Sequence, residues 1–152
     1  MGSIRTFVAA AVVMFGCDVG QPAGGDVLVG TWTGGMSVEE ALLAPDAAGA
    51  RWSVSRFSSL TLATAEEFAL LGDSGRLTLV FAENRLVKVR FQPTALDGFL
   101  ETLRRSSGLD LVGQEVVRRG RVEIQAWSAE EGEESVYWVD TSLEEQLGLA
   151  SP

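Results

Sequence analysis

The stretch RLTLVFAENRLVKVRF, residues 76–91, constrains the fold more than any other part of the chain. Apolar and polar side chains alternate along both of its halves, as they do in strands that bury one face. The polar residues 83–85 separate the halves, so we predict an antiparallel hairpin. A three-residue loop there would place Phe81 opposite Val87, whereas a two-residue loop would place Leu79 opposite a lysine. We therefore predict the three-residue loop, because directly paired residues share a face.

A helix is predicted at residues 95–107, shortly after this hairpin. Its apolar residues recur at positions i, i+3, i+4 and i+7, which form one face of a helix: Leu96, Phe99, Leu100 and Leu103. We expect Thr94 to cap the first turn and Gly108 to end the helix. A lone helix and a lone hairpin are both marginal in water. We therefore predict that the helix packs on the sheet that the hairpin forms.

Shorter segments complete the order of elements. The segments with β-branched and aromatic content are predicted strands: 27–34, 51–63, 115–127 (with a turn at Arg119-Gly120) and 134–139. Capped helices are predicted to begin at Ser37, with a glutamate three residues later, and at Thr141 or Ser142. Residues 64–71 fit either a helix or a strand. Because hairpins dominate, we predict an α+β fold: a single domain at 27–152, with an antiparallel β-sheet and helices packed on one face.

The first seventeen residues carry a different signal. Arg5 precedes an uninterrupted apolar run, Phe7–Phe15, and the small Gly16 and the sole cysteine, Cys17, follow at once. The run is less than half of the ~20 residues needed to span a membrane, and it matches the apolar core of a secretory signal. The arrangement resembles a bacterial lipoprotein signal. That resemblance implies that Cys17 becomes the first mature residue and is lipidated.

The resemblance divides the chain into three parts: a signal peptide at 1–16, the lipidated Cys17 with a flexible tether at 17–26, and the folded domain at 27–152. Three alternatives stay open. The chain could be secreted without a lipid. Gly2–Thr6 matches the short N-myristoylation pattern. The segment could also be an ordinary first strand or helix with a buried cysteine.

Charge and composition exclude several functions. The chain holds 12 basic and 21 acidic residues, a formal net charge of −9. Such a chain is not attracted to nucleic acid or to an anionic lipid surface, so its expected membrane contact is the lipid on Cys17. Histidine is absent and the lipid would consume the only thiol, which excludes Ser-His and Cys-His catalysis. We expect no enzymatic activity, no catalytic residue, and no cofactor or metal site.

Two charged clusters are candidate ligand sites. Glu130–Glu134 could hold calcium, but so short a loop supplies few converging oxygens, which favours a solvated loop. Arg118, Arg119 and Arg121 surround a predicted turn. They could bind a phosphate or an acidic partner, or balance nearby glutamates.

Aromatic residues give a second kind of candidate. Trp127, Tyr137 and Trp138 lie on neighbouring predicted strands. Because successive residues of a strand face opposite ways, Tyr137 and Trp138 cannot both lie in the core. One of them is exposed to a partner or lies under the last helix. Gly30 and Trp32 form a G-x-W pattern that resembles that of lipocalins, in which the tryptophan closes one end of a ligand-binding barrel. A core aromatic on an early strand is the favoured explanation here.

Together these features predict a bacterial envelope lipoprotein, anchored at the inner or the outer membrane through Cys17. Its expected role is that of a non-enzymatic interaction or accessory module, with another envelope protein as partner. The alternative is a lipocalin-like carrier of a small ligand.

Overall fold

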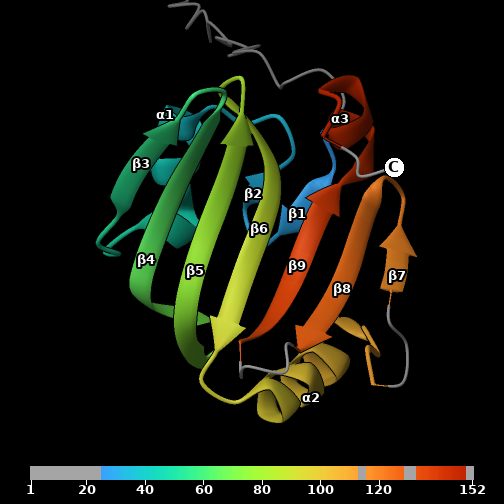
Figure 1. Ribbon diagram of the computed structural model, residues 1–152. Coiled ribbons are helices and arrows are strands. Elements are labelled where there is room, and N and C mark those ends of the chain that lie inside the picture. The colour runs from blue at the N-terminus through green and yellow to red at the C-terminus, as the bar shows by residue number, and fades with distance from the viewer. Residues whose placement is uncertain (1–24, 113–115, 129–132, 150–152) are drawn as a thin grey trace, which may run out of the picture.

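The computed structural model of the chain describes residues 25–112, 116–128 and 133–149. Seven antiparallel strands form one sheet in the order β3-β4-β5-β6-β9-β8-β7 (Figure 1). In that order the strands are Ser53–Phe57, Leu60–Leu70, Asp73–Ala82, Arg85–Pro93, Glu134–Asp140, Val122–Ser128 and Val116–Arg119. Two short strands, β1 (Val27–Val29) and β2 (Trp32–Thr33), pair with each other. The helices are α1 (Val38–Leu42), the 3-10 helix η1 (Pro45–Ala47), α2 (Leu96–Ser107) and α3 (Thr141–Gln146).

The chain is thus mostly antiparallel sheet with a small helical part, as the hairpin pattern predicts. The sheet is open, with β3 and β7 as its edge strands. Figure 1 views it from the face that no helix crosses, with α1, β1 and β2 behind it. α3 departs from the predicted packing on one face: it buries none of its residues and lies at the end of β9. Six residues with a single leucine give it no apolar stripe to bury.

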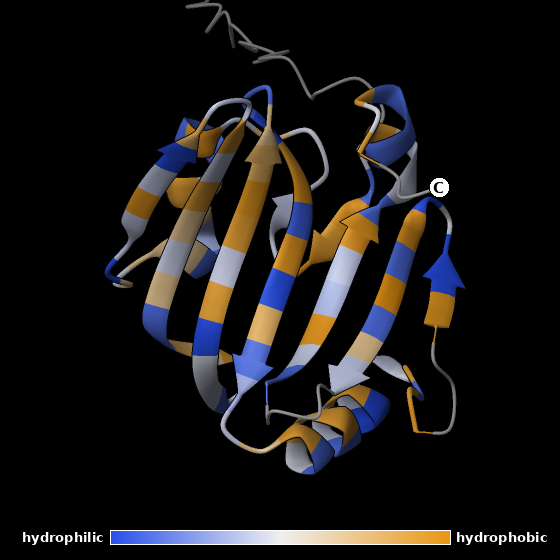
Figure 2. Ribbon diagram, viewed as in Figure 1, coloured by the Kyte–Doolittle hydropathy of each residue, from blue (hydrophilic) through white to orange (hydrophobic). Residues whose placement is uncertain are grey.

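One face of the sheet is apolar and forms the core. Alternate side chains of the central strands point to it and are almost completely buried: Leu77, Leu79, Phe81, Val89, Phe91, Val136 and Trp138. Mostly polar residues stand between them, and Figure 2 shows this alternation along the strands. We call the apolar side the core face and the opposite side the open face.

The β5–β6 hairpin has the predicted pairs at its middle, such as Leu79 with Val89, but the predicted three-residue loop is wrong. The loop consists of two residues, Glu83 and Asn84. Both have positive φ angles, 49° and 58°, as a type I′ turn requires. The twist of this turn matches the twist of the strands that it joins, which favours it over the longer loop.

A β-bulge reconciles the short loop with apolar pairing. Phe81 pairs with Leu86, and β6 skips Val87, so the predicted Phe81–Val87 pair is also wrong. Because Val87 is skipped, the apolar pairs farther along the strands, Leu79 with Val89 and Leu77 with Phe91, form as the alternation predicts. The bulge is also where the chain before α1 docks: Gly35 donates its N–H to the Leu86 carbonyl, and Leu86 donates to the Met36 carbonyl.

The helix α2 buries the predicted stripe. The Phe99 ring contacts Phe91 of β6 and Trp138 of β9, with ring centroids 4.8 and 6.3 Å away. The predicted packing of this helix on the hairpin is therefore confirmed for β6, and β9 shares the contact. Gly108 ends the helix in the left-handed conformation at φ 66°, as predicted.

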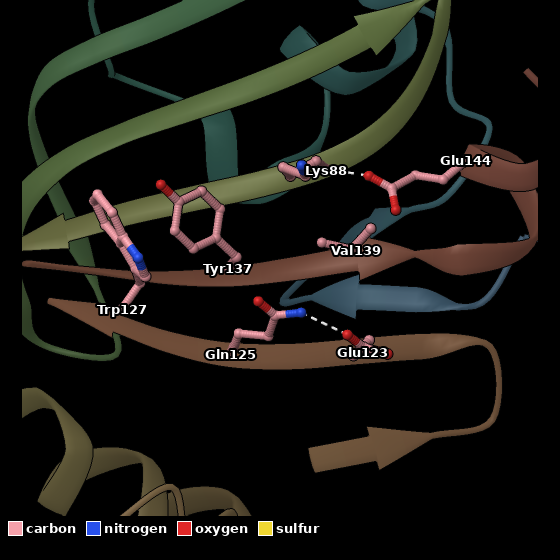
Figure 3. A pocket seen from close by; sticks show the side chains of 7 residues that line it. All are labelled: Lys88, Glu123, Gln125, Trp127, Tyr137, Val139 and Glu144. Atoms are coloured by element: carbon pink, nitrogen blue, oxygen red, sulfur yellow. Dashed lines mark hydrogen bonds and ion pairs between the residues drawn. The ribbon is translucent and has the colours of Figure 1, made fainter. Parts of the chain in front are cut away.

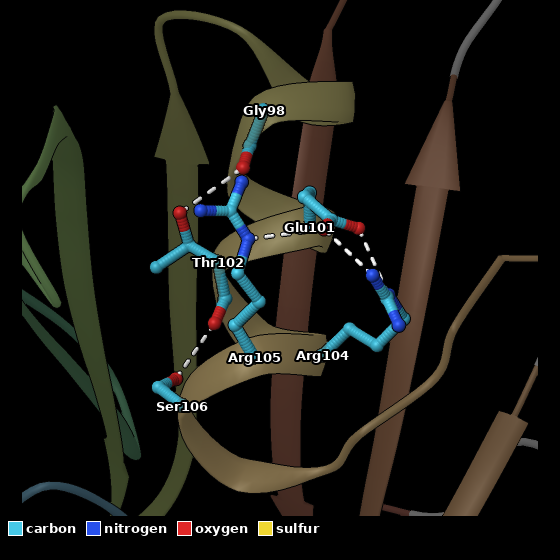
Figure 4. Close-up of polar contacts among 6 residues, drawn as sticks. All are labelled: Gly98, Glu101, Thr102, Arg104, Arg105 and Ser106. Carbon is cyan, nitrogen blue, oxygen red and sulfur yellow. Dashed lines mark hydrogen bonds and ion pairs between the residues drawn. The ribbon is translucent and has the colours of Figure 1, made fainter.

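The two ends of α2 differ in how well the sequence predicts them. Thr94 is not the N-cap: its N–H and hydroxyl both donate to the Ser74 carbonyl, so it extends the β5–β6 ladder. Toward the other end, Glu101 accepts hydrogen bonds from Arg104 and Arg105 (Figure 4). These basic residues in the last turn also oppose the negative end of the helix dipole.

Residues 27–34 form two strands, not the single predicted strand. Gly30 has a left-handed φ of 57°, and the chain reverses there between β1 and β2. Asp46 holds the turn, because its carboxylate accepts the Thr31 N–H at 2.7 Å. Trp32 is completely buried and donates from Nε1 to the Ala41 carbonyl, so the favoured explanation, a core aromatic, is confirmed.

The predicted capping box of α1 is confirmed, with Ser37 and Glu40 bonding each other's backbone N–H groups. The long strand predicted at 51–63 is wrong. It is divided into β3 and β4 by a turn at Ser58-Ser59, where Ser58 has a φ of 47°. Residues 64–71 belong largely to β4, so the strand alternative holds there.

Asp140 caps α3 in place of the predicted Thr141 or Ser142, because its carboxylate accepts the Leu143 N–H at 3.1 Å. The β7–β8 turn lies at Gly120-Arg121, one residue later than predicted. Among the described residues, no helix has the length and apolarity needed to cross a membrane. The predicted signal peptide and the lipidated cysteine lie outside the described residues.

Candidate functional site

The candidate site lies on the open face, where β6, β9 and β8 run side by side. Strand alternation sends every second side chain of these strands away from the core. Most of the outward residues are polar or aromatic: Lys88 and Arg90 on β6, Tyr137 on β9, and Glu123, Gln125 and Trp127 on β8. No helix crosses this part of the face in Figure 1. The sheet itself therefore presents these side chains directly.

A hollow of about 320 Å³ lies among these side chains. Figure 3 shows its seven lining residues: Lys88, Glu123, Gln125, Trp127, Tyr137, Val139 and Glu144. Six come from the three strands, and Glu144 reaches in from α3. The Glu144 carboxylate lies 3.3 Å from the Lys88 ammonium, which ties the helix to the face.

Tyr137 is the centre of this surface. It pairs with Arg90 on one side and with Gln125 on the other, so three outward side chains stand in a row across the strands. The Arg90 guanidinium carbon lies 5.5 Å from the centroid of the tyrosine ring, and the Lys88 ammonium lies 5.9 Å from it. Both distances are in the range of cation–π attraction. The ring is half-buried by these neighbours and is held in place by them.

The charges around the ring are paired. Arg118 of β7 contacts Glu123 at 2.9 Å, and Gln125 donates a hydrogen bond to the same carboxylate. Arg90 donates to the Ser135 hydroxyl and to Glu133, each at 3.1 Å. The arrangement is suited to recognition by hydrogen bonds and ion pairs.

Trp127 gives this surface its apolar part. Its side chain is 49% exposed and lines the hollow beside Tyr137. Tryptophan, tyrosine and arginine are the residues most enriched where protein interfaces bind most strongly. A half-exposed indole ring beside paired charges therefore gives this surface the residue types that are enriched in protein interfaces.

The structure separates the aromatic residues as the alternation predicts. Tyr137 lies on the open face and Trp138 in the core, where it is 1% exposed. Trp127 shares the open face with Tyr137. The sequence interpretation left open which of Tyr137 and Trp138 would be outward, and the structure places Tyr137 there.

The arginine cluster does not form one site. Arg118 lies on the open face against Glu123, whereas Arg119 points to the core face and donates to the Ser107 carbonyl. Arg121 contacts Asp26 at 3.5 Å. Alternation along β7 accounts for the division, because neighbours in a strand face opposite ways.

Two other predicted sites, the lipidated cysteine and the acidic loop, lie wholly or partly outside the described residues. Cys17 and residues 130–132 of the acidic loop lie outside the described residues. Among those that are described, no group of acidic residues has the geometry to hold a metal ion. Sequence reasoning missed Glu144 as a site residue, since nothing in the sequence links the last helix to β6.

Comparison of the chain with protein-family models, with curated proteins and with solved structures finds no match. Its function therefore has to be inferred from the open face and from the sequence.

Proposed function

We propose that this chain is a lipid-anchored module of the bacterial envelope that binds another envelope protein through the open face around Trp127 and Tyr137. The observation that carries the proposal is the half-exposed Trp127 beside a tyrosine held by two cations, on a sheet face without a covering helix. A lone domain gains nothing from exposing an indole ring. A partner that covers it would gain hydrophobic burial together with specific polar contacts.

The charges favour a protein as the occupant. A net charge of −9 opposes binding to nucleic acid or to an anionic membrane surface. On the face itself positive and negative groups alternate in pairs, Lys88 with Glu144 and Arg118 with Glu123. Such a mixed pattern is complementary to the mixed charges of a protein surface. Charge pairs of this kind determine the orientation in which a partner docks more than they determine its affinity.

The anchor supports the same role. The apolar run before Cys17 would place the domain at a membrane, and the tether at 17–26 would let the open face turn toward a neighbour. A non-catalytic role agrees with the lack of histidine and with carboxylates that are already engaged by cations.

The proposal can be tested by co-purification of the full chain, extracted in mild detergent from cells that express it. The double variant Trp127→Ala, Tyr137→Ala should lose the co-purifying protein by about tenfold or more, because central aromatic residues carry most interface energy. Val54→Ala is the matched control. Val54 is 42% exposed, but it lies on the other face of the sheet, paired with the buried Ala63.

The control variant should retain its partner at the wild-type level. Equal recovery with the double variant, or equal loss with the control, would mean that the open face is not the interface.

A further inference from the structure

The core face contains a second feature that the proposed function does not use. A cavity of about 370 Å³ opens between β1, the end of α2 and β8. Its walls are apolar and almost completely buried: Leu28, Leu103, Leu109, Val122, Ile124 and Trp138. Val27 and Leu71 also line it and are exposed, by 62% and 46%. The apolar lining thus continues from the interior to the surface.

Arg119 is the one charged residue that lines this cavity among the residues that the structure describes. It projects from β7 on the core face, because its partner in the strand ladder is the buried Val122. One nitrogen of its guanidinium donates to the Ser107 carbonyl at 2.8 Å. A guanidinium has five N–H donors, so others stay available. Within the described part of the chain Arg119 makes no ion pair, although its neighbours Arg118 and Arg121 do.

We infer that this cavity binds a single-chain amphiphile with an anionic headgroup, with the alkyl chain against the apolar wall and the headgroup on Arg119. Guanidinium groups bind carboxylates and phosphates through paired hydrogen bonds. The volume lies at the small end of ligand pockets, which suits one alkyl chain. The ligand site is separate from the open face, since Arg118 and Arg119 point to opposite sides of β7.

The size and chemistry of the site make a quantitative expectation possible. Each methylene that enters the cavity should tighten binding about fourfold. Loss of the headgroup charge should weaken binding about tenfold, as expected for hydrogen bonds to a charged group. A fatty acid and a lysophosphatidic acid share this chemistry, and both are included in the test.

The test uses the full chain carrying Cys17→Ser, so that no attached lipid competes, and a dansyl-labelled fatty acid as fluorescent probe. Decanoate, dodecanoate, methyl dodecanoate and a lysophosphatidic acid of the same chain length then compete for the probe, all below their micelle concentrations. Dodecanoate should displace the probe about fifteenfold better than decanoate, in line with two added methylenes. The methyl ester should be about tenfold weaker than the acid.

Two variants locate the site. Arg119→Gln should remove the advantage of the acid over its ester, and Arg118→Gln, one residue away on the opposite face, should keep it. Ser106→Trp, at an exposed lining position of α2, should block the cavity and abolish displacement. Circular dichroism checks that each variant is folded.

Wild-type binding by Ser106→Trp, or no saturable binding by the parent chain, overturns the cavity as a ligand site. An acid–ester difference that persists in Arg119→Gln overturns Arg119 as the headgroup contact. Stronger competition by the lysophosphatidic acid than by dodecanoate identifies the headgroup as a phosphate, and the reverse order identifies it as a carboxylate; either order supports the site.

Discussion

The ring of Phe99 in α2 lies 4.8 Å from the ring of Phe91 in β6, centroid to centroid, with an angle of 57° between their planes. Both rings are completely buried. Tilted aromatic pairs at this separation are favourable beyond the area that they bury. This pair joins α2 to the centre of the sheet. Because β6 also carries residues of the open face, the packing of α2 supports that face as well.

Phe99→Ala should destabilise the domain by about 3–5 kcal/mol, because it leaves a cavity between α2, Phe91 and Trp138. Asp97→Ala, in the first turn of the same helix, should cost about 1 kcal/mol or less, mainly through the helix dipole. Urea unfolding curves of both variants measure the two free energies. A wild-type midpoint for Phe99→Ala would show that the helix does not contribute to the core.

Gly75 and Gly98 should respond to alanine in opposite directions. A Cβ at Gly75 in β5 would lie 2.2 Å from the Gln92 carbonyl oxygen and 2.9 Å from the Phe91 ring, so Gly75→Ala should destabilise the domain. Gly98 lies in α2 with no heavy atom within 4 Å of such a Cβ. Gly98→Ala should stabilise the domain by about 0.5–1 kcal/mol through helix propensity. Thermal melts measure the change in melting temperature of each variant relative to the wild type. Changes of the same sign in both variants would contradict the described packing of Gly75 and Gly98.

The sequence predicts the central hairpin and α2 well, because each has one unbroken period of apolar residues. It cannot place the bulge, since Leu86 and Val87 are both apolar and alternation alone does not say which one is skipped. The predicted capping residue of α3 is wrong for a similar reason. Asp140, Thr141 and Ser142 are three consecutive residues that can each cap a helix, and the end of β9 decides among them.

The candidate site could be predicted only in part. Alternation predicts that one of Tyr137 and Trp138 faces outward, and this much follows from local pattern. That these strands lie together depends on the order β6-β9-β8, which joins segments far apart in the sequence. The contact of Glu144 with Lys88 depends on where α3 leaves the sheet, and no local signal encodes it.

The Glu101 carboxylate should make stability depend weakly on pH. Hydrogen bonds from Arg104 and Arg105 lower the pKa of Glu101 from 4.5 to about 2. A lowered folded-state pKa stabilises the fold above the unfolded value, and this contribution is lost as the pH falls from about 4.5 toward about 2. Solvent screens the pair, whose glutamate side chain is 38% exposed, so the effect should be small.

Glu101→Gln should therefore be slightly less stable than the wild type at pH 7, and the difference should vanish toward pH 2. Added salt should shrink the difference at pH 7 as well. Denaturation at several pH values, with and without salt, measures both effects. A difference that stays constant down to pH 2 would mean that the ion pair is not its cause.

The anchor can be tested by intact-mass spectrometry of the full chain after extraction from bacterial membranes. We expect a species that begins at Cys17 and carries two or three acyl chains, because stable anchoring requires more than one. Cys17→Ser should yield an unlipidated chain that no longer partitions into membranes. A wild-type species that retains residues 1–16, or an unmodified Cys17, would contradict the anchor.

In the cell, the open face around Trp127 should be covered by another envelope protein. A photo-reactive benzoylphenylalanine in place of Trp127, in the full chain and in intact cells, tests it most directly. The same residue in place of Leu43 is the control, because Leu43 is 84% exposed but follows α1, behind the sheet. We predict one discrete adduct from position 127 and none of that mass from position 43, with the adduct lost when Lys88→Glu is added. No adduct at position 127, or the same adducts from both positions, would contradict the account.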